Sequence, residues 1–150
     1  MSPGDIDSKV VSQRVFWISQ MIDSLKDLHL EEKTAFLADR HKIAAAESYL
    51  RRALEALFDI GRHILAKRFA YPAAEYKEIA KGLSDNKVLV EKEAELMRKM
   101  AGYRNRMVQF YHEITPEELH EICLHHHSEI KLLVDKLVQW IKEHQNSGIN

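Results

Sequence analysis

The sequence has little cysteine, proline and glycine, and each shortage argues against a class of protein. Its 150 residues include one cysteine, three prolines and five glycines. The single thiol, Cys123, excludes an intrachain disulfide and a zinc site built from cysteines. So few prolines and glycines are unusual for a β protein rich in tight turns. We therefore expect a reduced, mostly helical protein.

An excess of one charge and long apolar runs are also missing. Lysine and arginine total 22 against 23 acidic residues, a net charge of −1. This balance excludes a uniformly basic coat for nucleic acid, although not a local basic patch. No apolar run approaches the ~20 residues of a membrane span, and the N-terminus has no secretory pattern. We expect one cytoplasmic domain, residues 1–150, without membrane contact.

Apolar residues recur at helical spacing through nearly the whole chain. The pattern predicts helices over about 8–29, 39–69, 73–81, 87–112 and 116–145, the last with a break near 125–128. Gly61 in mid-helix indicates a close approach of another backbone, and Gly82 is expected to end the 73–81 helix. Thr115-Pro116-Glu117-Glu118 has the form of a capping box. Together these elements predict an all-α, up-and-down bundle of four main helices plus short extras.

The polar end of the 87–112 helix is the most informative segment. At about 100° per residue, its large apolar residues form one stripe: Leu96, Met100, Tyr103, Met107 and Phe110. Asn105, Gln109 and His112 fall almost opposite that stripe, and Arg104 and Tyr111 lie between the two zones. The helical wheel therefore predicts that this polar group faces away from the core of the monomer.

Two interpretations of this group remain open on composition alone. Arg98, Lys99, Arg104 and Arg106 can simply form a solvated basic face, which is the common fate of charge runs. Alternatively they form a phosphate site, in which arginine supplies a rigid fork of donors, Asn105 a neutral donor and His112 a proton carrier near neutral pH.

The segment 104–111, Arg-Asn-Arg-Met-Val-Gln-Phe-Tyr, resembles the Arg-Asn-x-x-Val-His-x-Tyr signature of the HEPN superfamily, and most closely its HepT-like branch. Residues 112–119 and 53–63 are also similar to that branch. The resemblance implies a homodimeric helical bundle that acts as a metal-independent endoribonuclease on RNA. It further implies a toxin of a type II or type VII toxin–antitoxin pair, neutralised by a minimal nucleotidyltransferase antitoxin.

The resemblance also assigns roles to individual residues. It makes Arg104 and Asn105 catalytic, places Gln109 at the position of the family histidine, and makes Tyr111 the acceptor of AMP from the antitoxin. His112 is a possible further catalytic residue, since it follows Arg106 at the looser superfamily spacing. We expect Arg106, Asp59 and His63 to support the site, and we expect no cofactor.

Gln109 is the one departure from the signature that changes the chemistry. An amide cannot exchange a proton near neutral pH, so the expected acid–base group is missing. A natural glutamine predicts an impaired toxin, whereas an engineered one would make the protein tolerable to its expression host. The alternative function is a non-catalytic HEPN module that binds a nucleotide or a nucleotidyltransferase partner.

Two other histidine-containing groups favour structural interpretations. His125, His126 and His127 are consecutive, so on a helix they point about 100° apart and cannot all face one metal ion; His126 is expected at the core or at a helix junction, and no metal site is predicted. Asp59 and His63 are four residues apart and can pair with each other. We favour a surface or interhelical ion pair there, and a supporting role for the Arg104 site is the alternative if the 39–69 helix lines the cleft.

Overall fold

The structure is a computed structural model that describes residues 4–109 and 113–145. The described residues form seven helices and no strand: α1 (Ser8–Lys26), α2 (Lys33–Leu37), α3 (Arg40–Phe69), α4 (Tyr76–Asp85), α5 (Glu91–Val108), α6 (Pro116–His125) and α7 (His127–His144). Four are long and three are short, so the predicted all-α bundle is confirmed. None of the described helices combines the length and hydropathy needed to cross a membrane.

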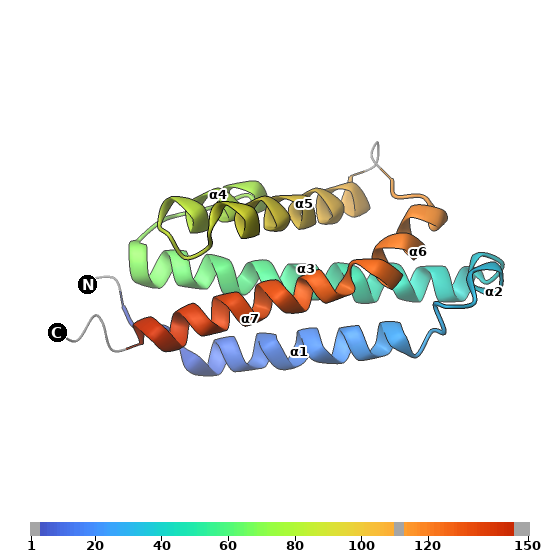
Figure 1. Cartoon of the computed structure of the whole chain (residues 1–150), viewed down its shortest axis with the longest axis horizontal. Helices are drawn as coiled ribbons and strands as arrows, with labels where there is room; N and C mark the ends of the chain where they lie inside the picture. Colours follow the sequence, from blue (N-terminus) through green and yellow to red (C-terminus); the bar gives the residue numbers. More distant parts are fainter. Residues whose placement is uncertain (1–3, 110–112, 146–150) are drawn as a thin grey trace.

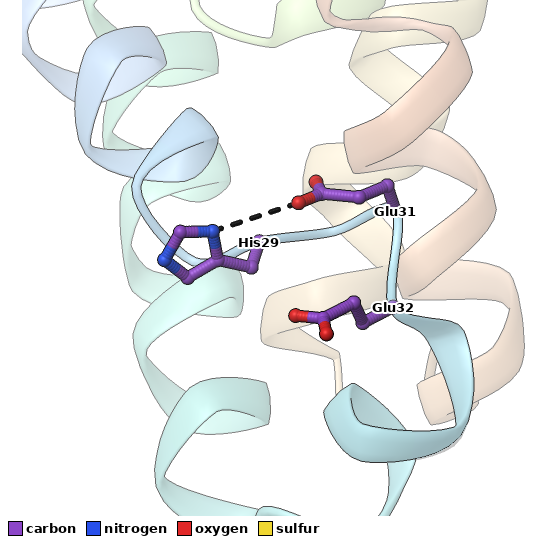
Figure 2. A group of neighbouring side chains, drawn as sticks. All are labelled: His29, Glu31 and Glu32. Carbon is purple, nitrogen blue, oxygen red and sulfur yellow. Dashed lines mark ion pairs between the residues drawn. The ribbon is translucent and has the colours of Figure 1, made fainter.

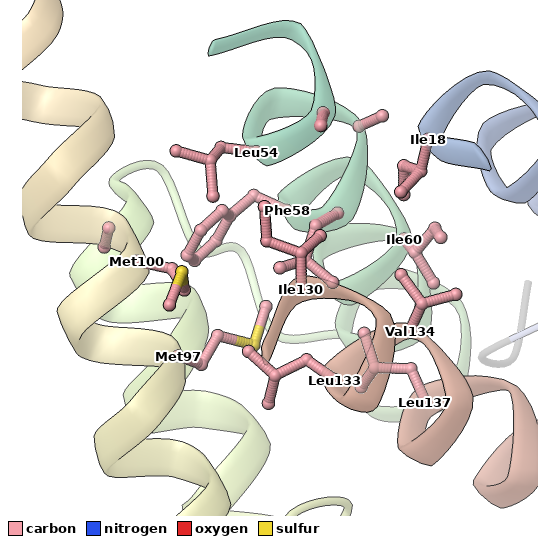
Figure 3. Close-up of a cluster of buried hydrophobic side chains, with 14 of the residues drawn as sticks. Ile18, Leu54, Phe58, Ile60, Met97, Met100, Ile130, Leu133, Val134 and Leu137 are labelled. Atoms are coloured by element: carbon pink, nitrogen blue, oxygen red, sulfur yellow. The ribbon is translucent and has the colours of Figure 1, made fainter. Parts of the chain in front are cut away.

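The longest helix, α3, is the centre of the bundle and contacts each of the other six. Figure 1 shows α4 and α5 together along one side of α3, with α7 and α1 on the other side. The core between them takes side chains from α1, α3, α5 and α7 (Figure 3). Phe58 and Leu54 of α3 and Met97 of α5 are completely buried there. The buried side chains therefore fix the centre of α3, on which α4 and α5 pack.

The helix ends follow the expected start and stop signals in most places. Asp7 and Asp39 cap α1 and α3 by accepting hydrogen bonds from the backbone N–H groups of the second and third residues of each helix. The hydroxyl of Thr115 accepts from the N–H of Glu118, and Pro116 is the first residue of α6. His126 separates α6 from α7, which confirms the predicted break and the junction position of that histidine.

Gly82 does not end a helix, so that prediction was wrong. Helix α4 begins later than expected and continues through Gly82 to Asp85. A Cβ atom at position 82 would lie 2.9 Å from Cε1 of Tyr71 and 3.0 Å from Cδ1 of Leu65. The glycine is needed for close packing, not for chain reversal. At Gly61 a Cβ would lie 3.0 Å from side-chain atoms of Ile79 and Leu83, so α4 side chains, and not a backbone, make the approach predicted there.

We expect Gly82→Ala to lower the free energy of unfolding by about 1–3 kcal/mol, because the added methyl group overpacks the contact with Tyr71 and Leu65. Urea denaturation measures the change. Gly102→Ala is the matched control, since a Cβ at position 102 of α5 meets nothing within 4 Å. There alanine should be neutral or stabilising by up to about 1 kcal/mol. Equal stability of the two variants would contradict the packing role of Gly82.

Candidate functional site

The face of α5 that packs into the bundle is not the one that the large apolar residues indicated. Its buried residues are Ala94, Met97, Met100 and Ala101, whereas Leu96, Tyr103 and Met107 are only partly buried. Arg104 follows Ala101 by three residues and therefore continues the buried face. The predicted position of Arg104, between the apolar stripe and the polar face, was therefore wrong, because the two alanines that form the contact carry little weight in a pattern of large side chains. Gln109 is exposed, as predicted.

Arg104 is held between α3 and α4. Its Nε and Nη2 atoms both donate to Oε2 of Glu55 on α3, at 3.2 and 3.1 Å. The guanidinium carbon lies 4.4 Å from the ring centroid of Tyr76, the first residue of α4. A carboxylate and a ring face together fix the plane of the guanidinium, as both hydrogen bonding and cation–π attraction require.

Tyr76 is itself fixed by the core. Its ring stacks on Phe58 of α3, with centroids 4.7 Å apart and an angle of 3° between the planes. Burial raises the pKa of Tyr76, and the positive charge of Arg104 partly opposes this shift. The phenol therefore stays neutral at physiological pH. Phe58, Tyr76 and Arg104 form a continuous stack from the core to the surface.

A hollow of about 420 Å³ opens beside this stack. Its polar lining comprises Arg62, Glu75, Tyr76, Arg104, Asn105 and Gln109. We call this hollow the Arg104 cleft. It brings together three of the residues that the sequence singled out, Arg104, Asn105 and Gln109. The two arginines can bind the oxygens of a phosphodiester, and Asn105 can add a neutral donor.

Gln109 stands at the end of α5. It is the C-cap residue, its backbone N–H donates to the carbonyl of Asn105, and its side chain is exposed. The amide can hydrogen-bond a ligand in the cleft but cannot carry a proton. Tyr111 and His112, the other two residues predicted for the site, lie outside the described residues.

Arg106 has a structural partner outside the cleft. Its Nη1 and Nη2 atoms donate to the two carboxylate oxygens of Glu118, each at 2.6 Å. This bond raises the pKa of Arg106 and lowers the pKa of Glu118. The bridge joins α5 to the first turn of α6. It also explains why Thr115 and Glu118 form only half of the predicted capping box, because the carboxylate of Glu118 bonds Arg106.

The Glu118 bridge should make stability depend on pH in the acid range. A carboxyl whose pKa is lowered in the folded state stabilises the fold above its unfolded pKa of about 4.5, and the contribution disappears as pH falls through the folded pKa. For an exposed pair we expect about 0.5–1 kcal/mol, so Glu118→Gln should lower Tm by about 1–4 °C at pH 7. Below about pH 3 the variant and the parent should melt together.

Thermal unfolding followed by circular dichroism across this pH range measures the effect. Glu117→Gln is the matched control, because Glu117 occupies the same first turn of α6 and has no ion-pair partner among the described residues. A Glu118→Gln difference that is the same at both ends of the pH range would show that the carboxylate charge is not the cause.

Asp59 and His63 do not pair with each other. Asp59 accepts from Nε of Arg14 on α1 at 3.0 Å and from Nη1 of Arg62 at 3.5 Å. It therefore forms the favoured interhelical ion pair, and it reaches the Arg104 cleft only through Arg62. His63 accepts from the backbone N–H of Asp7 at 2.9 Å, and burial lowers its pKa, so the neutral ring anchors the start of α1.

Sequence reasoning missed the two side chains that hold Arg104. Glu55 lies inside the segment 53–63, which resembles the family. The only sign that Glu55 could reach the site is that it lies one helical turn before Asp59. Tyr76 follows Pro72 in a segment expected to form a short helix, with nothing to indicate that its ring would reach the end of α5.

The consecutive histidines do not converge on one point. Nδ1 of His126 lies 2.8 Å from Oε1 of Glu129, and Nδ1 of His127 lies 2.8 Å from the carbonyl of Cys123. Cys123 is buried, and its pKa is raised to about 12, as for a thiol that serves as a small apolar residue.

Within the part of the chain that the structure describes, one group has atoms close enough to share a metal ion. His29, Glu31 and Glu32 lie in the α1–α2 connection with their ligand atoms within 4.8 Å of one another (Figure 2). All three are exposed, and the one ion pair among them joins His29 to Glu31 at 3.5 Å. Exposed side chains of this kind often gather without a metal, and this group is not part of the Arg104 cleft.

The fold and the site define an all-α bundle in which an arginine, an asparagine and a glutamine of one motif line a single hollow. Comparison with protein families makes the assignment narrower. Residues 18–137 match the model of the family described as ribonuclease HepT-like. The chain therefore belongs to the HepT-like ribonuclease family.

Solved structures with the same fold include toxins and a protein of unknown function. A toxin–antitoxin structure with AMP-PNP shares 19% identity and a TM-score of 0.77 over 85% of this chain and 97% of that one. The tri-AMPylated HEPN toxin of Shewanella oneidensis, in complex with its MNT antitoxin, shares 19% identity with a TM-score of 0.79 over 87% and 97%. The cytosolic protein YutE of Bacillus subtilis shares 17% identity with a TM-score of 0.76 over 94% of both chains. A search of curated proteins found no match.

Proposed function

We propose that this chain is a metal-independent endoribonuclease toxin whose activity is impaired by Gln109. The main support for the proposal is the Arg104 cleft. Three residues of the family motif, Arg104, Asn105 and Gln109, line it, and Glu55 and Tyr76 hold the arginine in place. A pre-oriented guanidinium at the site of reaction stabilises negative charge as it develops on a phosphate, without the cost of reorganising solvent.

In this mechanism Arg104 binds the scissile phosphate and Asn105 orients it. A histidine at position 109 would remove the proton from the ribose 2′-OH or protonate the leaving oxygen. The 2′ oxygen then forms a bond to phosphorus, the bond to the 5′ oxygen breaks, and a cyclic phosphate and a free 5′-OH remain. Gln109 can hold neither proton, so only phosphate binding and orientation are left to the present side chains.

The proposal is tested by incubating RNA in EDTA with this protein and with its Gln109→His variant. We expect products that end in a cyclic phosphate, and no cleavage of a DNA strand of the same sequence, since DNA lacks the 2′-OH. If both proteins are folded and neither cleaves RNA, the ribonuclease proposal is wrong.

We further propose that the protein is a homodimer, as the family resemblance implies. The orientation of α5 gives this proposal no support of its own, because Arg104 faces α3 and α4 of its own chain. The proposal therefore depends on the family alone. Light scattering at micromolar concentration is the direct measurement, and a stable monomer would exclude a cleft shared between two subunits.

The proposed partner is a minimal nucleotidyltransferase antitoxin that transfers AMP to Tyr111. In that reaction the phenolic oxygen bonds the α-phosphorus of ATP, pyrophosphate leaves, and a base on the partner takes the proton. The added phosphodiester is negative and the adenosine is bulky, so an adduct close to Arg104 would oppose RNA binding. The AMPylated state of the Shewanella toxin supports this proposal.

We expect one AMP adduct on the peptide that contains Tyr111 after incubation with the partner and ATP, because the family motif places the acceptor there. Peptide mass mapping detects it. The adduct should be absent from Tyr111→Phe and unchanged in Tyr103→Phe, the matched control on α5. An adduct that persists in Tyr111→Phe would show that the acceptor is another residue.

A non-catalytic binding module is the second candidate, and Gln109 is the observation that favours it. Such a module would bind a nucleotide or the nucleotidyltransferase without cleaving RNA. Growth of cells that express the Gln109→His variant alone separates the two candidates, because a binding module should not arrest growth.

A further inference from the structure

A second hollow lies beside the Arg104 cleft, between α1 and α3. It has a volume of about 630 Å³ and is lined by polar and aromatic side chains that include Arg14, Trp17, Arg51, Arg52, Glu55 and Asp59. We call it the α1–α3 groove. Of its lining residues, the proposed reaction uses only Glu55, which holds Arg104.

Trp17 is the aromatic side chain of this groove. It is 38% exposed, whereas Trp140, the other tryptophan, is 9% exposed and packs against Phe69. The residue after Trp17, Ile18, is buried in the core, so α1 is firmly seated at this point. The indole therefore offers an accessible flat face from a rigid helix.

Three arginines and two carboxylates line the groove. Arg14 pairs with Asp59, and Arg51 pairs with Glu47 and Glu55. Arg52 is exposed and forms no ion pair with the described residues. Three arginines against two carboxylates leave the lining with a net positive charge, and both carboxylates are already engaged by arginines. An anion is the ligand that such a group favours.

Glu55 connects the groove to the cleft. Its Oε1 atom accepts from Arg51 in the groove at 3.3 Å, and its Oε2 atom accepts from Arg104 in the cleft at 3.1 Å. Two guanidinium groups thus lie on either side of a single carboxylate. The Arg104 cleft and the α1–α3 groove are therefore linked through the side chain of Glu55.

We propose that the α1–α3 groove binds the nucleotide next to the scissile phosphate of a single-stranded RNA, with its base stacked on Trp17 and its phosphate on Arg52. This inference depends on the proposed function, because it extends the same substrate beyond the cleft. An exposed aromatic face together with basic side chains is the combination that binds single strands with little sequence preference. A second copy of the chain is a less suitable occupant, because the lining is dominated by charged groups.

The test uses a short single-stranded 2′-O-methyl oligoribonucleotide, which cannot be cleaved through its 2′ position. Binding should quench the fluorescence of Trp17, and the quench should vanish in Trp17→Phe. Trp17→Ala should weaken binding about tenfold, the usual effect of losing one base–aromatic stack. Arg52→Ala should weaken binding and reduce the dependence of log Kd on log salt by about one, as for one lost phosphate contact.

Two exposed residues outside the groove serve as matched controls. Phe16 is the neighbour of Trp17 on α1 and is 63% exposed, and Arg98 is an exposed arginine on α5. Phe16→Ala and Arg98→Ala should leave Kd within about twofold of the parent, since most surface side chains contribute little.

The outcomes separate this inference from the proposed function. If Gln109→His cleaves RNA but Trp17→Ala binds the oligonucleotide as tightly as Phe16→Ala does, the groove is not a subsite and the ribonuclease proposal stands. If neither cleavage nor oligonucleotide binding occurs, both fail. If Trp17→Ala instead changes the mass measured by light scattering, the groove is an interface between copies and the inference is wrong.

Discussion

Gln109→His is expected to raise the rate of RNA cleavage by about 10²- to 10⁴-fold, the range that a positioned general acid or base contributes. The physical reason is that Arg104 and Asn105 already line the cleft at the end of α5, while the side chain at position 109 cannot move a proton. The gain should depend on pH, because imidazole titrates near neutrality whereas the amide of glutamine does not. Cleavage of an RNA oligonucleotide in EDTA, under single-turnover conditions, measures it.

Gln109→Asn is the matched control for this substitution, since it alters the side chain without adding a titratable group. It should cleave no faster than the parent. Expression of Gln109→His without an antitoxin should also arrest growth, and expression of Gln109→Asn should not. If a folded Gln109→His variant cleaves RNA at the same rate as Gln109→Asn, the side chain at position 109 takes no part in proton transfer.

Arg104→Ala is expected to lower the activity of the Gln109→His protein by about 10²- to 10³-fold, as for the loss of one pre-oriented donor to a developing negative charge. Arg104→Lys should still lose at least about tenfold, although it keeps the charge. The ammonium has no planar fork with which to bond Glu55 and face the ring of Tyr76 together, so its direction toward the phosphate is not fixed.

Arg98→Ala in the same background is the control, because Arg98 is an exposed arginine of the same helix that does not line the cleft. Unfolding by urea should accompany the assays to show that each variant is folded. If Arg104→Ala and Arg98→Ala have equal rates, then Arg104 does not act on the phosphate.

Much of the fold could be predicted from local signals in the sequence. Thr115-Pro116 marks the start of α6, and the break at His126 interrupts the apolar stripe of the last helical region. Such signals act within one helical turn, so they are visible without tertiary structure. The family resemblance also placed Arg104, Asn105 and Gln109 together, and the three residues line one hollow.

The orientation of α5 could not be predicted in the same way. Whether Ala101 or Tyr103 faces the core is decided by how closely α5 approaches α3 and α4, and that distance is a property of the whole bundle. The same is true of Gly82, which serves the packing of Tyr71 and not the end of a helix. Glu55 and Tyr76 are 49 and 28 residues from Arg104, so no periodic pattern connects them.

The geometry of the Arg104 cleft depends on the first turn of α4, because Tyr76 in that turn lies between Phe58 and Arg104. That helix has ten residues and follows a connection without regular helix, so its start should open more easily than the interior of α3. When this turn unfolds, the ring of Tyr76 moves away from Phe58. The guanidinium of Arg104 then keeps its hydrogen bonds to Glu55 but loses its contact with the ring of Tyr76. The cleft would then lose its geometry while the bundle stays folded, so we expect the cleft to come apart at a lower temperature than the bundle.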